Sequence, residues 1–149
     1  MNFGFPKQIN LQYFYLYLSG LLTTGFCLSW YKGKHMTHYM NLWDDSFQAI
    51  KEGWKTIEMR LLDEKRVSIK LNDTIEFSNV KTEEKLKCKV ICLYKYHDFY
   101  ELYKYHDKRS IGYKDNEDAN PEDMFMYYSQ DMIKKYGVIG IGLSVVEAD

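Results

Sequence analysis

Unlike charges gather in the segment Gly53–Arg60, which joins a predicted helix to a predicted strand. On a strand, Glu58 and Arg60 point to the same side, with their side chains about 7 Å apart. A carboxylate and a guanidinium at this spacing can pair with each other or share a ligand. Lys55 stands at the start of the strand and would join them if its side chain turned the same way. The spacing also fits a surface ion pair worth less than about 1 kcal/mol, so both interpretations stay open.

The cysteines and histidines predict neither a metal site nor a disulfide framework. Cys27, Cys88 and Cys92 form no CxxC pair and have no histidine at zinc-finger spacing. Cys88 and Cys92 are four residues apart in an alternating pattern, which predicts two apolar side chains on one face of a strand. His97 and His106 lie nine residues apart, which matches no common metal spacing and favours solvated or capping roles. We therefore expect no metal, no cofactor and a reducing cytoplasmic setting.

Two stripes of side chains offer contacts to RNA. The segment 94–105 interleaves five tyrosines with two lysines, and a base stacked on such a ring gains about 1–3 kcal/mol. Lys85, Lys87 and Lys89 alternate along a predicted strand and could contact phosphates. Structural roles are equally open, because alternation puts half of the rings in the core and a lysine face keeps an edge strand soluble.

Length and charge limit the kinds of protein that this chain can be. It has 149 residues, 46% hydrophobic and 28% charged, which is typical of one globular domain and unlike a disordered or multidomain chain. Lys and Arg number 20 against 21 Asp and Glu, a net charge of −1. A broad electrostatic attraction to nucleic acid is excluded, so any such binding has to use a local patch or cleft.

The first 31 residues differ from the rest, because Lys7 is their only charged residue. The stretch 9–31 is long enough to cross a bilayer as a helix, but its polar residues make the insertion energy marginal. A membrane-tethered interaction module is therefore one interpretation. A cleaved signal peptide is another, although no clean small-residue cleavage site follows the apolar stretch.

A third interpretation is that the leader is an upstream extension that the cell does not translate. Codons for Lys-Gly-Lys at 32–34 can spell a purine-rich tract, which resembles a bacterial ribosome-binding site placed before Met36. We divide the chain into an apolar leader, 1–35, and a domain, 36–149. The domain alone has 17 basic and 21 acidic residues, a net charge of −4, which favours a confined binding cleft.

From residue 36 onwards the hydrophobic pattern alternates as in strands, with helical segments inserted. The connector 80–84 is short enough for a β-hairpin, which argues against a parallel βαβ sheet. This order predicts an α+β fold, a small mixed or antiparallel β-barrel with peripheral helices. We predict strands at 37–42, 56–61, 74–78, 85–96 and 138–146, and helices that begin near Trp43 and Phe99 and span 122–136 with a break at Ser129.

Gly53, Lys55, Glu58 and Arg60 form the pattern Gly-x-Lys-x-x-Glu-x-Arg directly after the first predicted helix. This pattern resembles the signature of the ASCH domain family, which is related to the PUA fold, and the similarity extends over most of residues 36–147. The resemblance implies a PUA-like β-barrel with the motif on the floor of a cleft. It also implies binding of RNA or a nucleobase in RNA processing or translation-related regulation.

By position, the resemblance makes Lys55, Glu58 and Arg60 cleft residues, and we add their neighbours Trp54 and Thr56 to the ligand-binding candidates. The implied partner is RNA or a modified nucleoside. Some small members of the family are similar to amidohydrolases that remove the acetyl group of N4-acetylcytidine, which makes Lys55 and Glu58 catalytic candidates too. The threonine of the amidohydrolase motif falls at Glu58 here, and a later catalytic glutamate has no counterpart. Binding and hydrolysis stay alternatives.

Overall fold

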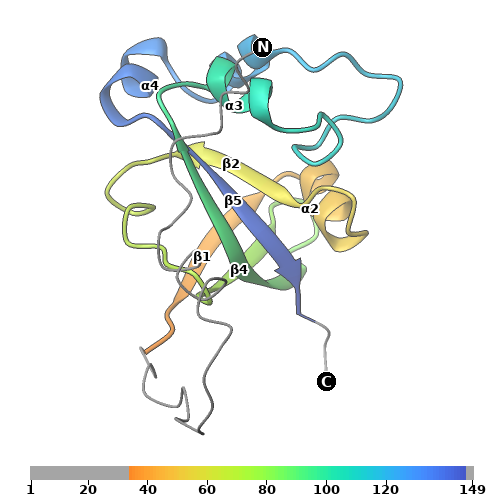
Figure 1. The fold of residues 1–149 in the computed structure, drawn as a ribbon. Coiled ribbons are helices and arrows are strands. Elements are labelled where there is room, and N and C mark those ends of the chain that lie inside the picture. Colours follow the sequence, from red (N-terminus) through yellow and green to blue (C-terminus); the bar gives the residue numbers. More distant parts are fainter. Residues whose placement is uncertain (1–33, 147–149) are drawn as a thin grey trace, which may run out of the picture. The chain divides into compact units, whose positions relative to one another are not determined.

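A computed structural model describes residues 34–146 of the protein (Figure 1). The stretch 9–31, on which the membrane-anchor and signal-peptide interpretations depend, lies outside the described residues. Within 34–146, no helix has the length and apolar character needed to cross a membrane. The strands are β1 (Thr37–Leu42), β2 (Ile57–Leu61), β3 (Thr74–Asn79), β4 (Lys85–Tyr96) and β5 (Val138–Val145), and the helices are α2 (Asp44–Lys51), α3 (Phe99–Tyr105), the 3-10 helix η1 (Pro121–Met126) and α4 (Gln130–Tyr136).

Five strands form one curled sheet, a half-closed barrel, in the order β1-β3-β4-β5-β2 (Figure 1). β1 pairs with β3 in parallel, whereas the other three ladders are antiparallel. The predicted hairpin joins β3 to β4. Mixed pairing with interspersed helices confirms the predicted α+β class and the PUA-like barrel. β1 and β2 are the edges of the sheet, and we call the line along which they face each other the seam.

Apolar side chains cover both faces of the sheet. In the β2-β5 ladder Glu58 lies opposite Ile141 and Arg60 opposite Ile139, so both polar side chains project to the inner face, where the main core lies. The other side chains of β2 pack outward against α3, η1 and α4. β2 is therefore buried on both faces, although its alternation of polar and apolar residues is typical of a half-buried strand, and Glu58 on its polar face is only 4% exposed. The outer cluster contains Ile57, Met59, Leu61, Phe99, Leu102, Ile111, Met124, Ile133 and Val138.

A β-bulge in β4 reverses the alternation of that strand. Cys88 lies opposite Val145 but Cys92 opposite Gly142, so the two cysteines project to opposite faces, and the prediction that they share a face is wrong. The register shifts at Ile91, where the bulge adds one residue to β4. Gly142 leaves room for the shifted strand, because a Cβ atom there would lie 2.8 Å from the Cβ of Cys92.

The helix ends agree with the sequence signals. Asp98 caps α3, where its carboxylate accepts a hydrogen bond from the backbone N–H of Glu101 at 2.8 Å. Ser129 separates η1 from α4 and caps α4 in the same way. Gly53 follows α2 with a φ of +83°, a left-handed conformation that glycine adopts without strain. This turn leads the chain from α2 directly into the charged motif.

The buried amide of Asn79 fastens α2 to the β3-β4 hairpin. Asn79 is 1% exposed, its Nδ2 donates to Oδ1 of Asp44 at 2.8 Å, and its Oδ1 accepts from the backbone N–H of Lys81 at 2.9 Å. The Lys81 ammonium lies 2.9 Å from the other oxygen of Asp44. Hydrogen bonds from Lys81 and then Asn79 lower the pKa of Asp44 to about 2. This link fixes the first turn of α2, which carries Ser46 of the site described below.

The substitution Asn79→Ala is expected to lower the free energy of unfolding by about 1–3 kcal/mol, because buried hydrogen-bonding groups lose their partner. Urea unfolding followed by circular dichroism measures this loss. Ser78→Ala is the matched control, since the Ser78 hydroxyl accepts only from Lys85 at the surface, and it should change stability by less than about 0.5 kcal/mol. Equal losses in the two variants would contradict an anchoring role for Asn79.

Candidate functional site

A cleft of about 570 Å³ opens where the inner face of β2 meets the end of β1, the start of α2 and the segment 103–128. Its floor carries the charged motif, and much of its wall is aromatic. The residues that line it include Asn41, Trp43, Ser46, Lys55, Glu58, Arg60, Tyr103, Gly112, Tyr113, Asp123, Met126, Tyr127 and Tyr128.

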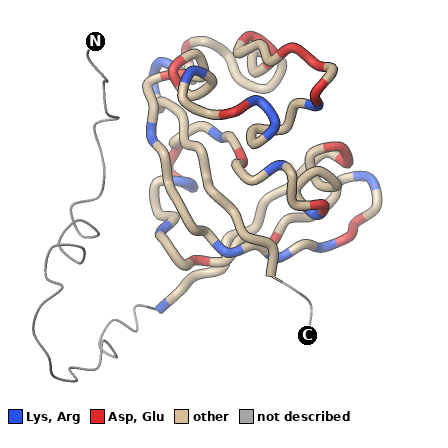
Figure 2. Tube along the Cα trace, turned by 45° about the vertical axis from the view of Figure 1, so that its right-hand side comes forward, with Lys and Arg blue, Asp and Glu red and all other residues tan. Residues whose placement is uncertain are grey.

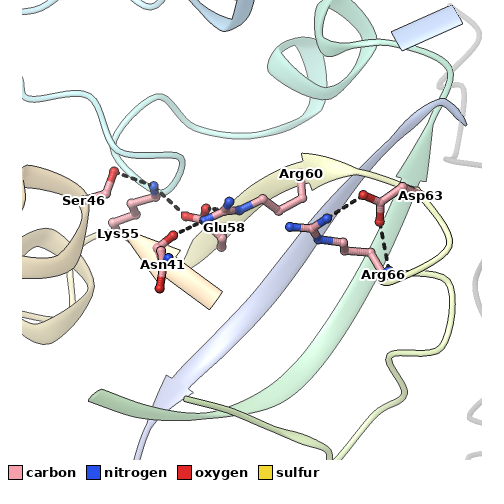
Figure 3. Close-up of polar contacts among 7 residues, drawn as sticks. All are labelled: Asn41, Ser46, Lys55, Glu58, Arg60, Asp63 and Arg66. Carbon is pink, nitrogen blue, oxygen red and sulfur yellow. Dashed lines mark hydrogen bonds and ion pairs between the residues drawn. The ribbon is translucent and has the colours of Figure 1, made fainter. Parts of the chain in front are cut away.

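Glu58 lies between two cations on the floor of the cleft (Figure 3). Nζ of Lys55 is 2.8 Å from Oε2 of Glu58, and Nε of Arg60 donates to Oε1 at 2.8 Å. The Lys55 side chain therefore turns to the same side as the other two, as the shared-ligand interpretation requires. Oε2 is buried and has no other polar partner than the Lys55 ammonium among the described residues.

The outer ends of this group reach two other elements. Nζ of Lys55 donates to Oγ of Ser46 on α2 at 3.1 Å, and Nη2 of Arg60 donates to the backbone carbonyl of Asn41 on β1 at 2.8 Å. Figure 3 shows this row of contacts from Ser46 through Lys55 and Glu58 to Arg60 and Asn41. The charged group thus connects α2, β2 and β1 across the seam.

The electrostatics of the group favour its charged form. Burial alone would raise the pKa of Glu58, but the charges of Lys55 and Arg60 outweigh it and hold the pKa of Glu58 below its ordinary value. Burial would lower the pKa of Arg60, and the carboxylate of Glu58 reverses this and raises it. Two cationic side chains around one carboxylate leave the floor of the cleft with a surplus of positive charge.

Only one member of the group is accessible to a ligand. The side chain of Arg60 is 17% exposed, whereas those of Lys55 and Glu58 are 6% and 5% exposed. Lys55 is covered by the glycine at position 112, whose φ is +111° and where a Cβ atom would lie 3.0 Å from Cδ of Lys55. Arg60 is therefore the residue that a bound molecule can touch, and the other two hold it in place.

The wall opposite the charged floor carries tyrosines that the sequence analysis did not select as one group. The hydroxyl of Tyr103 lies 3.0 Å from that of Tyr113, which donates to Oδ2 of Asp123 at 2.7 Å. Burial raises the pKa of both tyrosines, so both stay protonated at neutral pH. At the rim, Trp43 and Tyr127 are 66% and 57% exposed. Large exposed rings beside a cleft are suited to stacking on a flat ligand.

Two predicted ligand-binding residues do not line this cleft. Trp54 points elsewhere, where its Nε1 donates to Oε2 of Glu52 at 2.9 Å and the Arg109 guanidinium lies 5.4 Å from its ring centre. Thr56 has an exposed side chain, and its backbone carbonyl accepts from Leu143 at 2.8 Å. The structure thus brings together Lys55, Glu58 and Arg60 but not these neighbours.

The predicted tyrosine stripe at 94–105 does not form one surface either. The hydroxyl of Tyr96 bonds Nε2 of His106 at 2.9 Å, and its ring stacks on that of Tyr105, away from the cleft. Tyr103 alone of the stripe lines the cleft. Among residues 34–146 no three His, Cys, Asp or Glu side chains gather closely enough to hold a metal ion.

The sequence profile described as the ASCH domain matches residues 40–147, well over half of the chain. The chain belongs to the ASCH domain family. This ASCH domain resembles the crystal structure of hypothetical protein PH0355, with 31% identity, a TM-score of 0.64 and coverage of 74% of this chain and 100% of that one. It also resembles the solution NMR structure of protein PF0455 from Pyrococcus furiosus, with 30% identity, a TM-score of 0.61 and coverage of 76% and 100%. No curated protein matches the chain.

The substitution Glu58→Gln is expected to lower the free energy of unfolding at neutral pH by about 3–5 kcal/mol, because Lys55 and Arg60 lose their buried counter-charge. The pKa of Glu58 is lowered in the folded state from its ordinary 4.5, so its stabilisation is complete above that value and is lost as the pH falls below it. The difference in the free energy of unfolding between the wild type and Glu58→Gln should therefore become smaller in acid. Urea unfolding at a series of pH values measures it.

Glu76→Gln provides the control for this pH series. Glu76 lies on β3, is partly exposed and forms no ion pair within residues 34–146. The substitution Glu76→Gln should change the free energy of unfolding by less than about 0.5 kcal/mol at every pH. A gap for Glu58→Gln that does not vary with pH would mean that the carboxylate charge is not what stabilises the group.

Proposed function

We propose that this ASCH domain binds RNA, or a nucleotide or nucleobase from it, in the cleft between the floor at Arg60 and the tyrosine-rich wall. The observation that carries the proposal is this pairing of one accessible guanidinium with several rings. Arginine binds phosphate or base acceptors through a planar set of N–H donors. Aromatic rings stack on any base. We further propose that the protein acts in RNA processing or translation-related regulation, as its family membership suggests.

The size of the cleft supports the same ligand. Sites for small molecules and cofactors measure about 300–1,000 Å³. At about 570 Å³, this cleft is suited to a nucleoside or nucleotide. A flat base could lie among the rings of Tyr103, Tyr127 and Trp43 while its polar groups face Arg60.

The distribution of charge favours binding in a confined place. The chain as a whole has a net charge of −1, and acidic residues are frequent on the segment between α3 and α4 that borders the cleft (Figure 2). A duplex drawn to a broad positive surface is therefore not the expected ligand. A single nucleotide or an unpaired base, held by local contacts, fits this distribution.

Variants at the floor and the rim test the proposal, measured as the affinity of a fluorescently labelled single-stranded RNA by polarisation. Tyr127→Ala should weaken binding by about 1–3 kcal/mol through loss of stacking. Arg60→Gln should weaken it as well and reduce its dependence on salt. Tyr105→Ala is the matched control, because Tyr105 is exposed, like Tyr127, but lies outside the cleft.

Circular dichroism verifies that each of these variants is folded. If the affinity of folded Tyr127→Ala and Arg60→Gln equals that of the wild type, the cleft is not the RNA site. If Tyr105→Ala weakens binding as much as Tyr127→Ala, the rings act nonspecifically and the proposal fails in the same way.

Hydrolysis of an acylated nucleoside is a second candidate function, favoured by the contact of Lys55 with Ser46 in the same cleft. Such a reaction needs a group that can take up a proton. Glu58 is poorly suited to this role, because it is buried and its two cationic neighbours hold its pKa below the ordinary value. Binding without hydrolysis therefore accounts better for the geometry.

We expect no release of cytidine when the protein is incubated with N4-acetylcytidine, because Glu58, the carboxylate beside Lys55, is a weak base. Chromatography of the nucleosides measures the product. Glu58→Thr, which places the amidohydrolase residue at this position, should be inactive as well. Turnover by the wild type that is abolished in Ser46→Ala would establish the enzyme in place of the binding protein.

A further inference from the structure

A second groove, of about 590 Å³, adjoins the cleft at Arg60. It shares Asn41 and Arg60 with the cleft, so the two hollows meet at the seam. β1 supplies one bank of the groove, and the segment after β2 supplies the other. Its distinctive residues are His38, Tyr39, Asn41, Arg60, Lys65 and Arg66.

Positive charge predominates in this groove. Arg60, Lys65 and Arg66 all line it, and no carboxylate does. Nη1 of Arg66 pairs with Oδ2 of Asp63, as Figure 3 shows, which holds that guanidinium in place. Lys65 is exposed and forms no ion pair within residues 34–146. Within residues 34–146 Lys65 is therefore the one unpaired cation of the groove, and an anion would meet it beside two guanidiniums that each hold a carboxylate.

The edge of β1 adds polar backbone groups to the same groove. The carbonyls of Met36 and Leu42 accept hydrogen bonds from the β3 side, at Thr74 and Val80. In a parallel strand, successive residues direct their backbone N–H and C=O groups to opposite edges of the strand. The backbone groups of Tyr39 and Asn41 therefore point away from β3 and toward the seam. The Asn41 carbonyl receives Arg60 there. The other groups on this edge have no ladder partner among the described residues.

Tyr39 gives the groove an aromatic surface. Tyr39 is 74% exposed, which makes it one of the most exposed large hydrophobic residues of the described domain. The groove therefore repeats the pairing of the cleft, a ring beside cations, and joins it through the shared residue Arg60. Two such sites joined at one cation suit a ligand in which bases alternate with phosphates.

We propose that the groove binds the nucleotide next to the one in the cleft, and that the ligand is a single-stranded oligonucleotide which crosses the seam. The linking phosphate lies on Arg60, the next phosphate on Lys65 and Arg66, and the next base against Tyr39. This inference rests on the proposed function of the cleft. It assigns binding to residues outside the family motif, and it excludes an isolated nucleoside as the full ligand.

The test compares the affinities of uridine monophosphate and a short oligouridylate for the intact protein and three variants. The oligouridylate should bind the wild type more tightly. Lys65→Gln with Arg66→Gln should lower its affinity by about tenfold and its salt slope by about 0.7 for each lost phosphate contact. Tyr39→Ala should lower the affinity for the oligouridylate as well. None of these changes should alter the affinity of the monophosphate, which occupies the cleft.

Lys134→Gln with Lys135→Gln is the matched control, because it removes the same charge from exposed α4 residues that line neither hollow. The control should leave oligouridylate binding unchanged. If the oligouridylate binds but the groove variants match the control, the groove inference is overturned while the cleft function stands. If neither ligand binds the wild type, the proposed function itself fails. Equal affinities of the two ligands for the wild type would also overturn the inference.

Discussion

The carboxylate of Glu58, buried between two cations, is the constraint on which the rest of the site depends. A charge removed from water is tolerated only when it is paired and its surroundings hold the partners in place. Lys55 can reach this carboxylate only because α2 ends at a left-handed glycine and position 112 has no side chain. Arg60 reaches it from the same strand, two residues away. The local geometry of α2, β2 and the covering loop is thus set by one ion group.

This arrangement separates the tasks of holding and binding. Glu58 and Lys55 are almost fully covered, and the charged group contacts a ligand through the Arg60 guanidinium. The tyrosine wall comes from segments that the outer core holds against β2, with Met124 as one of their anchors. The ion group holds one side of the cleft in place, and the packed tyrosine wall holds the other. A ligand that enters the cleft therefore meets a guanidinium beside flat apolar rings.

Most of the fold could be predicted from the sequence, because strand alternation, caps and glycine turns are local signals. The charged motif could also be recognised in the sequence, because its residues lie close together in the chain. The reversal of β4 at Ile91 could not, since a bulge is set by its partner strand and leaves the composition unchanged. The burial of Glu58 was missed because nothing local shows that helices cover the far face of β2. Tyr113, Tyr127 and Trp43 come together only through tertiary packing, whereas Trp54, chosen for its nearness in the chain, does not line the cleft.

The contact between Arg60 and the carbonyl of Asn41 crosses the seam, where the described residues form no backbone ladder. This half-closed barrel is therefore bridged at its seam by the same side chain that faces the ligand. If backbone hydrogen bonds closed the seam, the stability of the fold would not depend on a residue that binds the ligand. Here closure of the seam and ligand binding both depend on the Arg60 guanidinium. In evolution or in engineering, specificity cannot be retuned at this position without also altering the mechanical closure of the barrel. New ligand preferences are more readily gained at the aromatic rim, where rings can change while the seam stays intact.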